Sequence, residues 1–116
     1  MTRPRLATPF TAALGADNAR HCDTWYVYLL ECQGGRIYTG ITPHLAARMA
    51  AHAAGQGARF TRMHKPVQLL ASRGFASRNE ALREEYRIKQ TPPHTKRTLA
   101  RQWAAENMID WRPDRS

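Results

Sequence analysis

Aromatic and β-branched residues gather in two short stretches of the chain, residues 25–32 and 36–41, with Gly34 and Gly35 between them. This pattern is typical of two strands joined by a tight turn, so it predicts a β-hairpin. A third apolar stretch, residues 66–75, begins with a proline, which strands tolerate at their first position. The three stretches together predict three strands.

A Thr-Pro pair marks the start of a helix directly after the hairpin. Thr42 is a favourable N-cap residue, and Pro43 is a favourable first helical residue. We therefore expect a helix over residues 44–54, followed by Gly55 as its C-terminal residue. Residues 55–65, which contain two glycines and several basic side chains, are expected to form a basic loop.

Two further helices follow the third strand. Ser77 and Glu80 have the spacing of a capping box, which predicts a helix over residues 78–89. A pair of prolines ends this helix, and a last short helix is expected over residues 95–106. The order of elements is therefore β-β-α-β-α-α, which indicates an α+β fold with helices packed against a layer of three strands.

The length of the hairpin turn decides which side chains share a face of the sheet. A two-residue turn would place Tyr28 and Tyr38 on opposite faces. A three-residue loop, with one glycine in the left-handed region, would pair Leu30 with Tyr38 and place both tyrosines on one face. A buried phenol needs a hydrogen-bond partner, so this tyrosine pair indicates more than packing. We predict the three-residue loop, because a site shared by both hydroxyls needs this register or a bulge that achieves the same placement.

The chain has 116 residues, enough for one domain with a modest core. Eighteen Lys and Arg residues against nine Asp and Glu residues give a formal net charge of +9, and this imbalance favours polyanions such as DNA, RNA or anionic lipid. No apolar run approaches the ~20 residues that a membrane helix needs. The composition thus predicts a nucleic-acid-binding protein or a basic protein without a specific partner, and no membrane segment.

Composition also divides the chain into three parts. Residues 1–23 show no sustained period and are expected to form a flexible arm, residues 24–106 to form the domain, and residues 107–116 to form a tail. Cys22 and Cys32 do not have the spacing of a metal site, so we expect reduced thiols and a cytoplasmic protein.

Two of the predicted helices carry charged residues that packing does not explain. On the first helix, His44, Arg48 and His52 recur every four residues and line one face. This face is either solvated or a cationic ridge directed toward the hairpin. On the helix after the third strand, Glu85 falls among the apolar positions. A buried carboxylate there must be paired, with an arginine such as Arg48, or must hold a cation.

Segments 26–28 (Tyr-Val-Tyr) and 38–40 (Tyr-Thr-Gly) together resemble the paired signature of the GIY-YIG nuclease superfamily. The spacing onward to Arg48 and to Glu85 is similar as well, and the resemblance covers roughly residues 25–100, as in the small stand-alone proteins of this superfamily. Two positions depart from the signature: a tyrosine stands in place of its first glycine, and a threonine stands where Ile or Val is usual. The resemblance implies a three-stranded antiparallel sheet flanked by helices.

The resemblance also implies roles for individual residues. By likeness, Tyr28 is the general base and Tyr38 assists it by hydrogen bonding. Arg48 presents its guanidinium to the scissile phosphate, and His52 is an alternative base or a phosphate contact. Glu85 would bind Mg²⁺ or Mn²⁺ through one carboxylate, with water completing the shell. Because a free phenol has a pKa of about 10, Tyr28 needs nearby positive charge to lower its pKa before it can act as a base.

The predicted function is hydrolysis of phosphodiester bonds in DNA, branched or damaged duplex included, by a metal-dependent endonuclease. The alternative is a non-catalytic basic nucleic-acid-binding module on the same scaffold, and a third hypothesis is an RNA- or ribosome-associated protein. RNA stays open as a substrate. A chain of 116 residues leaves no room for a separate DNA-selecting domain, so specificity is expected from loops, the arms or a protein partner. The residues expected to contact nucleic acid are Arg59, Arg62, Lys65, Lys89 and Lys96.

Overall fold

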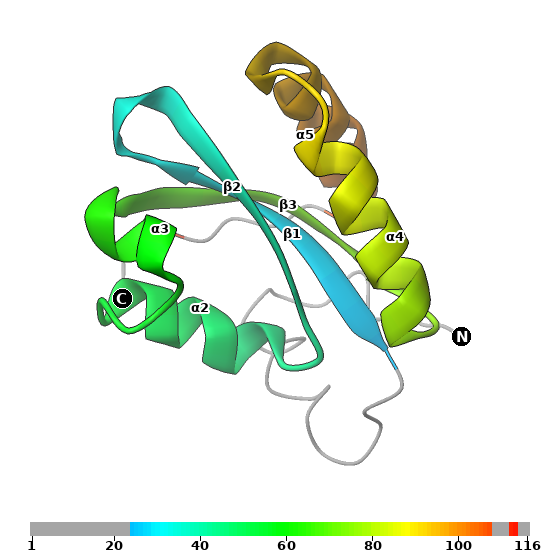
Figure 1. Cartoon of the computed structure of the whole chain (residues 1–116), viewed down its shortest axis with the longest axis horizontal. Helices are drawn as coiled ribbons and strands as arrows, with labels where there is room; N and C mark the ends of the chain where they lie inside the picture. Colours follow the sequence, from blue (N-terminus) through cyan, green and yellow to red (C-terminus); the bar gives the residue numbers. More distant parts are fainter. Residues whose placement is uncertain (1–23, 108–111, 114–116) are drawn as a thin grey trace.

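One antiparallel sheet of three strands organises the fold, with helices on both of its faces (Figure 1). The structure is a computed structural model, and it describes residues 24–107 and 112–113. The strands are β1 (Trp25–Cys32), β2 (Arg36–Thr42) and β3 (Pro66–Phe75), in the spatial order β2-β1-β3. A 3-10 turn, η2 (Gln33–Gly35), joins β1 to β2, and the helices are α2 (Leu45–Ala53), α3 (Arg59–Met63), α4 (Arg78–Lys89) and α5 (Pro93–Asn107).

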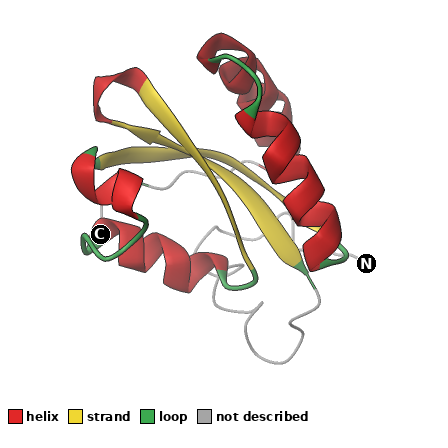
Figure 2. Cartoon of the chain, in the orientation of Figure 1, coloured by secondary structure: helices red, strands yellow, loops and turns green. Residues whose placement is uncertain are grey.

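The α+β fold predicted from the sequence, a three-stranded antiparallel sheet flanked by helices, is confirmed. Helices α2 and α3 lie on one side of the sheet, and α4 and α5 lie on the other (Figures 1 and 2). The basic loop expected at residues 55–65 contains α3, so that expectation is wrong for this part. The N–H of Arg62 donates to the carbonyl of Ala58 at 3.0 Å and closes a single helical turn. One turn is too short to show helical periodicity in a sequence.

The turn between β1 and β2 sets the register that places both tyrosines on one face. Leu30 pairs with Tyr38, and Tyr28 pairs with Gly40, so the register predicted for a three-residue loop is confirmed. The two glycines of the turn have φ values of 82° and 74°. Both glycines, and not one, therefore adopt the left-handed conformation that other residues avoid.

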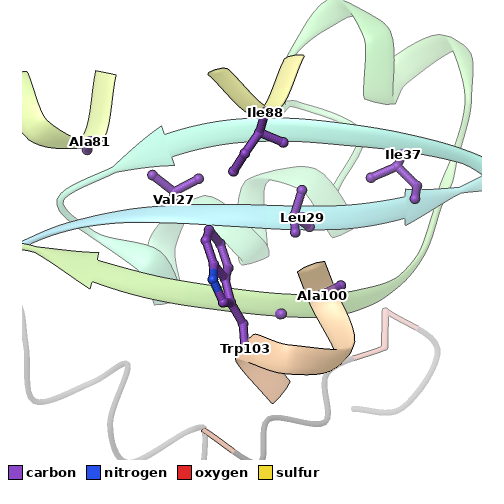
Figure 3. Packing of buried hydrophobic residues seen from close by; sticks show 8 residues of the cluster. Val27, Leu29, Ile37, Ala81, Ile88, Ala100 and Trp103 are labelled. Atoms are coloured by element: carbon purple, nitrogen blue, oxygen red, sulfur yellow. The ribbon is translucent and has the colours of Figure 1, made fainter. Parts of the chain in front are cut away.

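Each face of the sheet carries its own hydrophobic core. Successive side chains of a strand point to opposite faces, so Leu29 belongs to the core under α4 and α5, and Tyr28 belongs to the core under α2. The first core consists of Val27, Leu29, Ile37, Ala71, Ala81, Ile88, Ala100 and Trp103 (Figure 3). The second consists of Tyr28, Leu30, Cys32, Leu45, Met49 and Leu69. The tyrosine of the first motif is thus a core residue.

Helix α2 begins one residue later than the sequence predicts. Thr42 pairs with Tyr26 as the last residue of β2, so it is not the N-cap residue. His44 takes that position, and its N–H donates to the Thr42 hydroxyl at 3.0 Å. Thr42 therefore still satisfies a backbone donor at the start of the helix, but it does so from the end of the strand and across Pro43.

Helix α4 has the bounds that the capping box predicts. The N–H of Glu80 donates to Ser77 Oγ at 3.1 Å, and Glu80 Oε1 accepts from the N–H of Ala76 at 3.2 Å. Helix α5 begins at Pro93, two residues earlier than predicted, because proline suits the first turn of a helix.

Arg97 of α5 holds the tip of the hairpin. Its guanidinium donates to the carbonyl of Gly35 at 2.9 Å and lies 3.4 Å from the Glu31 carboxylate. Gln68 of β3 donates to the same carboxylate at 2.7 Å. The hairpin tip is therefore tied both to the neighbouring strand and to the last helix.

The predicted arm, residues 1–23, lies outside the described residues, as does most of the predicted tail, so the predicted division of the chain stays a prediction. Cys22 lies outside them as well. Cys32 is a free, buried cysteine, and burial raises the pKa of its thiol to about 11. In the part of the chain that the structure describes, no helix has the length and apolar character needed to cross a membrane.

The cap of α4 provides a test of the fold. Replacing Ser77 with alanine should lower the free energy of unfolding by about 1 kcal/mol, because the N–H of Glu80 loses its acceptor. Urea denaturation followed by circular dichroism measures this difference. Ser77→Asn keeps an oxygen acceptor and should retain most of the stability. Equal losses in the two variants would contradict the role of the cap.

Candidate active site

Tyr28 lies at the centre of the candidate site, on the face of the sheet that α2 covers. Its side chain is fully buried, at 0% exposure. Gly40 lies opposite it on β2, and a Cβ atom at this glycine would come within 2.5 Å of the Tyr28 hydroxyl and 2.9 Å of the Tyr38 ring. Glycine at position 40 therefore leaves the space that the phenol occupies.

Two side chains of α2 hold the Tyr28 hydroxyl. His52 Nε2 lies 2.9 Å from it, and Arg48 Nε donates a hydrogen bond to it at 3.3 Å. Arg48 and His52 are four residues apart, so one face of the helix supplies both partners. The structure thus brings together three of the residues expected at the site.

Tyr38 and Phe60 form the outer part of this group. The ring centroid of Tyr38 lies 6.1 Å from that of Tyr28 and 5.7 Å from that of His52. Phe60 of α3 stacks on Tyr38, with a centroid distance of 5.8 Å and an interplanar angle of 29°. Tyr38, Phe60 and Arg48 are half-buried, whereas Tyr28 and His52 are closed to solvent. Solvent therefore reaches this cluster of side chains at Tyr38, Phe60 and Arg48.

Burial decides the protonation states of Tyr28 and His52. It raises the pKa of the Tyr28 phenol above its usual value, and Arg48 offsets only part of this increase. Burial, together with the smaller effect of the charge of Arg48, lowers the pKa of His52 to about 4. Both side chains are therefore neutral at pH 7. In the protein alone, Arg48 therefore does not lower the pKa of Tyr28 below its usual value. His52 is buried, so it belongs to the core and not to a cationic ridge.

Residues 57–61 pack around the other edge of the His52 ring. Thr61 Oγ1 lies 2.9 Å from His52 Nδ1, and the Thr61 hydroxyl donates to the carbonyl of Ala58 at 2.9 Å. A Cβ atom at Gly57 would collide with the imidazole. Sequence reasoning misses Thr61, because nothing in its local pattern separates it from a surface threonine. Its contact with His52 arises only when the chain folds back from α3 onto α2.

Glu85 lies on α4, in the other helical layer. Ala81 and Ile88, four residues before it and three after it, are buried, so Glu85 shares the face of α4 that is turned toward β1 and β2. Its side chain is 16% exposed and forms an ion pair with Lys89 at 3.1 Å. The arginine partner considered for it, Arg48, is bonded to the buried phenol instead. Its role at the site stays a prediction.

The donor chemistry of Glu85 decides whether a divalent ion fits there. A carboxylate is a hard oxygen ligand, and this one is partly open to solvent, so it fits an Mg²⁺ ion held by one carboxylate, water and substrate oxygens. Within residues 24–107 and 112–113, no group of three or more His, Cys, Asp or Glu side chains is arranged to hold a metal.

The basic residues expected to contact nucleic acid divide between the two sides of the sheet. Arg59 and Arg62 are exposed on α3, which lies on the same side of the sheet as α2, and Lys65 is exposed directly before β3. Lys89 is ion-paired on α4, and Lys96 is on α5.

Residues 24–98 match the family model described as the GIY-YIG catalytic domain. The chain belongs to the GIY-YIG family. This membership confirms the resemblance that the tyrosine motifs carry, and the buried phenol and Gly40 are the places where those motifs meet in the fold. The family is a nuclease superfamily whose members are generally endonucleases, so the GIY-YIG domain implies a nucleic acid substrate.

Several relatives of this GIY-YIG chain are named UPF0213 proteins. One from Cupriavidus necator is 44% identical over 92 residues, which cover 79% of this chain and 95% of that protein. Another from Cupriavidus pinatubonensis is 53% identical over 66 residues, which cover 57% of this chain and 73% of that protein. The solution NMR structure of a UPF0213 protein from Bacillus halodurans is 39% identical, covers 73% of this chain and 93% of its own, and has a TM-score of 0.47. These names state no activity.

The burial of neutral His52 predicts a loss of stability in mild acid. The pKa of His52 is about 4 in the folded protein and 6.5 as the ordinary value, so the unfolded chain binds the extra proton between these pH values. The free energy of unfolding should therefore fall as the pH decreases from 6.5 to 4, by on the order of 2 kcal/mol from this residue. Urea denaturation at a series of pH values measures the profile.

His52→Gln provides the comparison, because it removes this titration and leaves the other ionisable groups in place. The difference between the two pH profiles isolates the contribution of His52. In NMR spectra of the parent protein, the ring C–H resonances of His52 should titrate near pH 4. Titration near pH 6.5 would contradict its burial as a neutral ring.

Proposed function

We propose that the protein is a divalent-metal-dependent endonuclease that hydrolyses phosphodiester bonds in DNA. The observation that carries this proposal is the Tyr28 hydroxyl, which contacts both Arg48 and His52 in the interior of a GIY-YIG domain. A position that served packing alone would have no use for a phenol with two polar partners. The arrangement combines a phosphate-binding guanidinium with groups that can accept a proton.

Arg48 is the residue that would meet the scissile phosphate. Its side chain is half-buried, and its bond to Tyr28, at 3.3 Å, is long for a hydrogen bond. A phosphate competes well for this guanidinium, because it offers shorter, charge-assisted bonds. When Arg48 binds the phosphate instead, the Tyr28 hydroxyl loses its hydrogen bond to Arg48. The attacking water can then reach this hydroxyl. Tyr38, half-buried beside it, orients that water.

Tyr28 acts as the base through His52. A neutral phenol takes a proton from water only if it gives up its own, and His52 Nε2, 2.9 Å away, is the acceptor within reach. Water transfers a proton to the Tyr28 oxygen, the Tyr28 proton moves to His52, and the water oxygen attacks phosphorus while the 3′ oxygen leaves with its electron pair. Burial is the main cause of the low pKa of His52, and the charge of Arg48 is the second. A phosphate at Arg48 would offset this second contribution, so substrate favours the transfer.

Glu85 would hold the divalent ion, Mg²⁺ or Mn²⁺, which when bound screens the phosphate charge and stabilises the leaving oxygen. To do so, Glu85 exchanges its ion pair with Lys89 for the metal. Lys89 then has its charge available for the DNA backbone.

Basic side chains beside the tyrosines supply the DNA-binding surface in this proposal. Arg59, Arg62 and Lys65 are exposed there, and the net charge of +9 favours a polyanion. Lys96 lies in the other layer and would meet DNA only where the duplex passes around the sheet. RNA carries the same backbone charge and is the second substrate to compare. A protein partner would supply sequence or structure preference.

A nicking assay on DNA with Mg²⁺ or Mn²⁺ tests the catalytic assignment. The parent protein should cleave, and removal of the metal with EDTA should abolish cleavage. Glu85→Gln and Arg48→Ala should each lower the cleavage rate by about 10²- to 10³-fold, the usual loss when a group that stabilises the transition state is removed. DNA affinity, measured by fluorescence anisotropy, should change much less for Glu85→Gln.

Glu84→Gln is the matched control, because Glu84 is the neighbouring carboxylate on α4 and is ion-paired with Arg87. It should cleave at the parent rate. Arg48→Lys should be nearly as inactive as Arg48→Ala, since lysine lacks the planar fork. Cleavage by Glu85→Gln at the parent rate would refute its role. DNA binding without cleavage by the parent would favour the second candidate, a non-catalytic nucleic-acid-binding module, which the existing Glu85–Lys89 ion pair also permits.

The position of the DNA-binding surface has its own test. Replacing Arg59, Arg62 and Lys65 together with alanine should reduce the slope of log K against log salt by up to about 2.7, since each lost phosphate contact removes about 0.9. Anisotropy titrations over a salt series measure the slope. The control removes the same charge from the other side of the sheet, by alanine at the exposed residues Arg78, Arg83 and Arg101. Equal reductions in both triple variants would show that binding follows net charge alone.

A further inference from the structure

His52 is engaged at both of its ring nitrogens. Nε2 lies 2.9 Å from the Tyr28 hydroxyl, and Nδ1 lies 2.9 Å from Thr61 Oγ1. In a neutral imidazole, one nitrogen donates a hydrogen bond and the other accepts one. The nitrogen that carries the hydrogen therefore decides whether His52 can receive a proton from Tyr28.

The hydrogen bonds of Thr61 favour the form with hydrogen on Nδ1. The Thr61 hydroxyl donates to the carbonyl of Ala58, three residues earlier, at 2.9 Å. Its single hydrogen is used in this bond, so only lone pairs are available to His52. Nδ1 is then the donor, and Nε2 has no hydrogen and accepts from Tyr28.

The contacts of Tyr28 favour the same form. Arg48 Nε–H already points at the Tyr28 oxygen. With hydrogen on Nε2, His52 would point a second donor at that oxygen, and the phenolic hydrogen would have to turn away from both donors, toward Tyr38. With hydrogen on Nδ1, every hydrogen in the group has an acceptor of its own. The bonds then run in one direction, from Arg48 through Tyr28, His52 and Thr61 to the carbonyl of Ala58.

The backbone before Thr61 is shaped around the same ring. A Cβ atom at Gly57 would collide with His52 Nδ1, so glycine lets the chain pass close to the imidazole edge. Thr61 is 2% exposed and His52 is 1% exposed. Water therefore does not compete for the bond between them, and the threonine hydroxyl controls the hydrogen of Nδ1.

We propose that Thr61 is a positioning residue that holds His52 as the Nδ1–H tautomer, so that Nε2 stays bare and can take the proton of Tyr28. This inference rests on the proposed function, in which His52 is that acceptor. In the transfer, the O–H bond of Tyr28 breaks and an Nε2–H bond forms. The resulting imidazolium keeps its Nδ1–H bond to Thr61 Oγ1, and the hydroxyl dipole, oriented by the carbonyl of Ala58, stabilises the new charge.

Nitrogen NMR of protein labelled at histidine tests the tautomer without any need for cleavage. Two-bond ¹H–¹⁵N spectra distinguish a protonated ring nitrogen from a bare one. At pH 7, His52 should show protonated Nδ1 and bare Nε2 in the parent and in Thr61→Ser, which keeps the hydroxyl. In Thr61→Val, which keeps the shape and loses the hydroxyl, the signals should shift toward the Nε2–H form.

A parent spectrum with protonated Nε2, or a Thr61→Val spectrum equal to that of the parent, would overturn the proposal. The parent spectrum decides the tautomer even if Thr61→Val does not fold.

Cleavage kinetics give the second measure. Thr61→Val should lower kcat by about 10²-fold, the lower end of what a general base contributes, with KM little changed. Thr61→Ser should cleave at close to the parent rate. Equal losses in both variants would indicate a packing role and overturn the proposal. If the parent does not cleave at all, the proposed function fails, and the NMR spectra still decide whether Thr61 positions His52.

Discussion

A phenol hydroxyl that is closed to water must find its hydrogen bonds inside the protein, and the Tyr28 hydroxyl imposes this requirement on one whole side of the sheet. Helix α2 meets it by turning Arg48 and His52 inward. The buried imidazole then needs a partner for its second nitrogen, which Thr61 provides from α3. Each buried polar group thus requires a partner from the next element of the chain. The last of these partners, Thr61, lies on the short helix α3.

The cores on the two faces of the sheet differ in composition. Under α4 and α5 the core is aliphatic, with one large indole at Trp103, and it contributes the burial that stabilises the fold (Figure 3). Under α2 the core mixes apolar residues with the hydrogen-bonded group around Tyr28. Glu85 is the exception, because it sits on the stabilising side and faces β1 and β2.

Features that depend on neighbours in the sequence could be predicted. The two turn glycines fixed the register of Tyr28 and Tyr38, and Ser77 fixed the start of α4, because turns and caps are local. Features that depend on burial could not. The high pKa of Tyr28 follows from desolvation inside the second core, and the hydrogen bond of Thr61 follows from the path of the chain after α2. Likewise, the sequence pointed to an arginine such as Arg48 as the partner of Glu85, whereas helix geometry brings Lys89, four residues later, to it.

The bond between Arg97 and the carbonyl of Gly35 spans 62 positions of the chain. The ribosome therefore releases β1, β2 and α2 well before the helix that fastens their turn is synthesised. Contacts of such long range form late and slow the folding of a small domain. A chain cut short before α5 would therefore keep the turn that pairs Leu30 with Tyr38, but it would lack the side chain that ties the tip of this turn to the last helix.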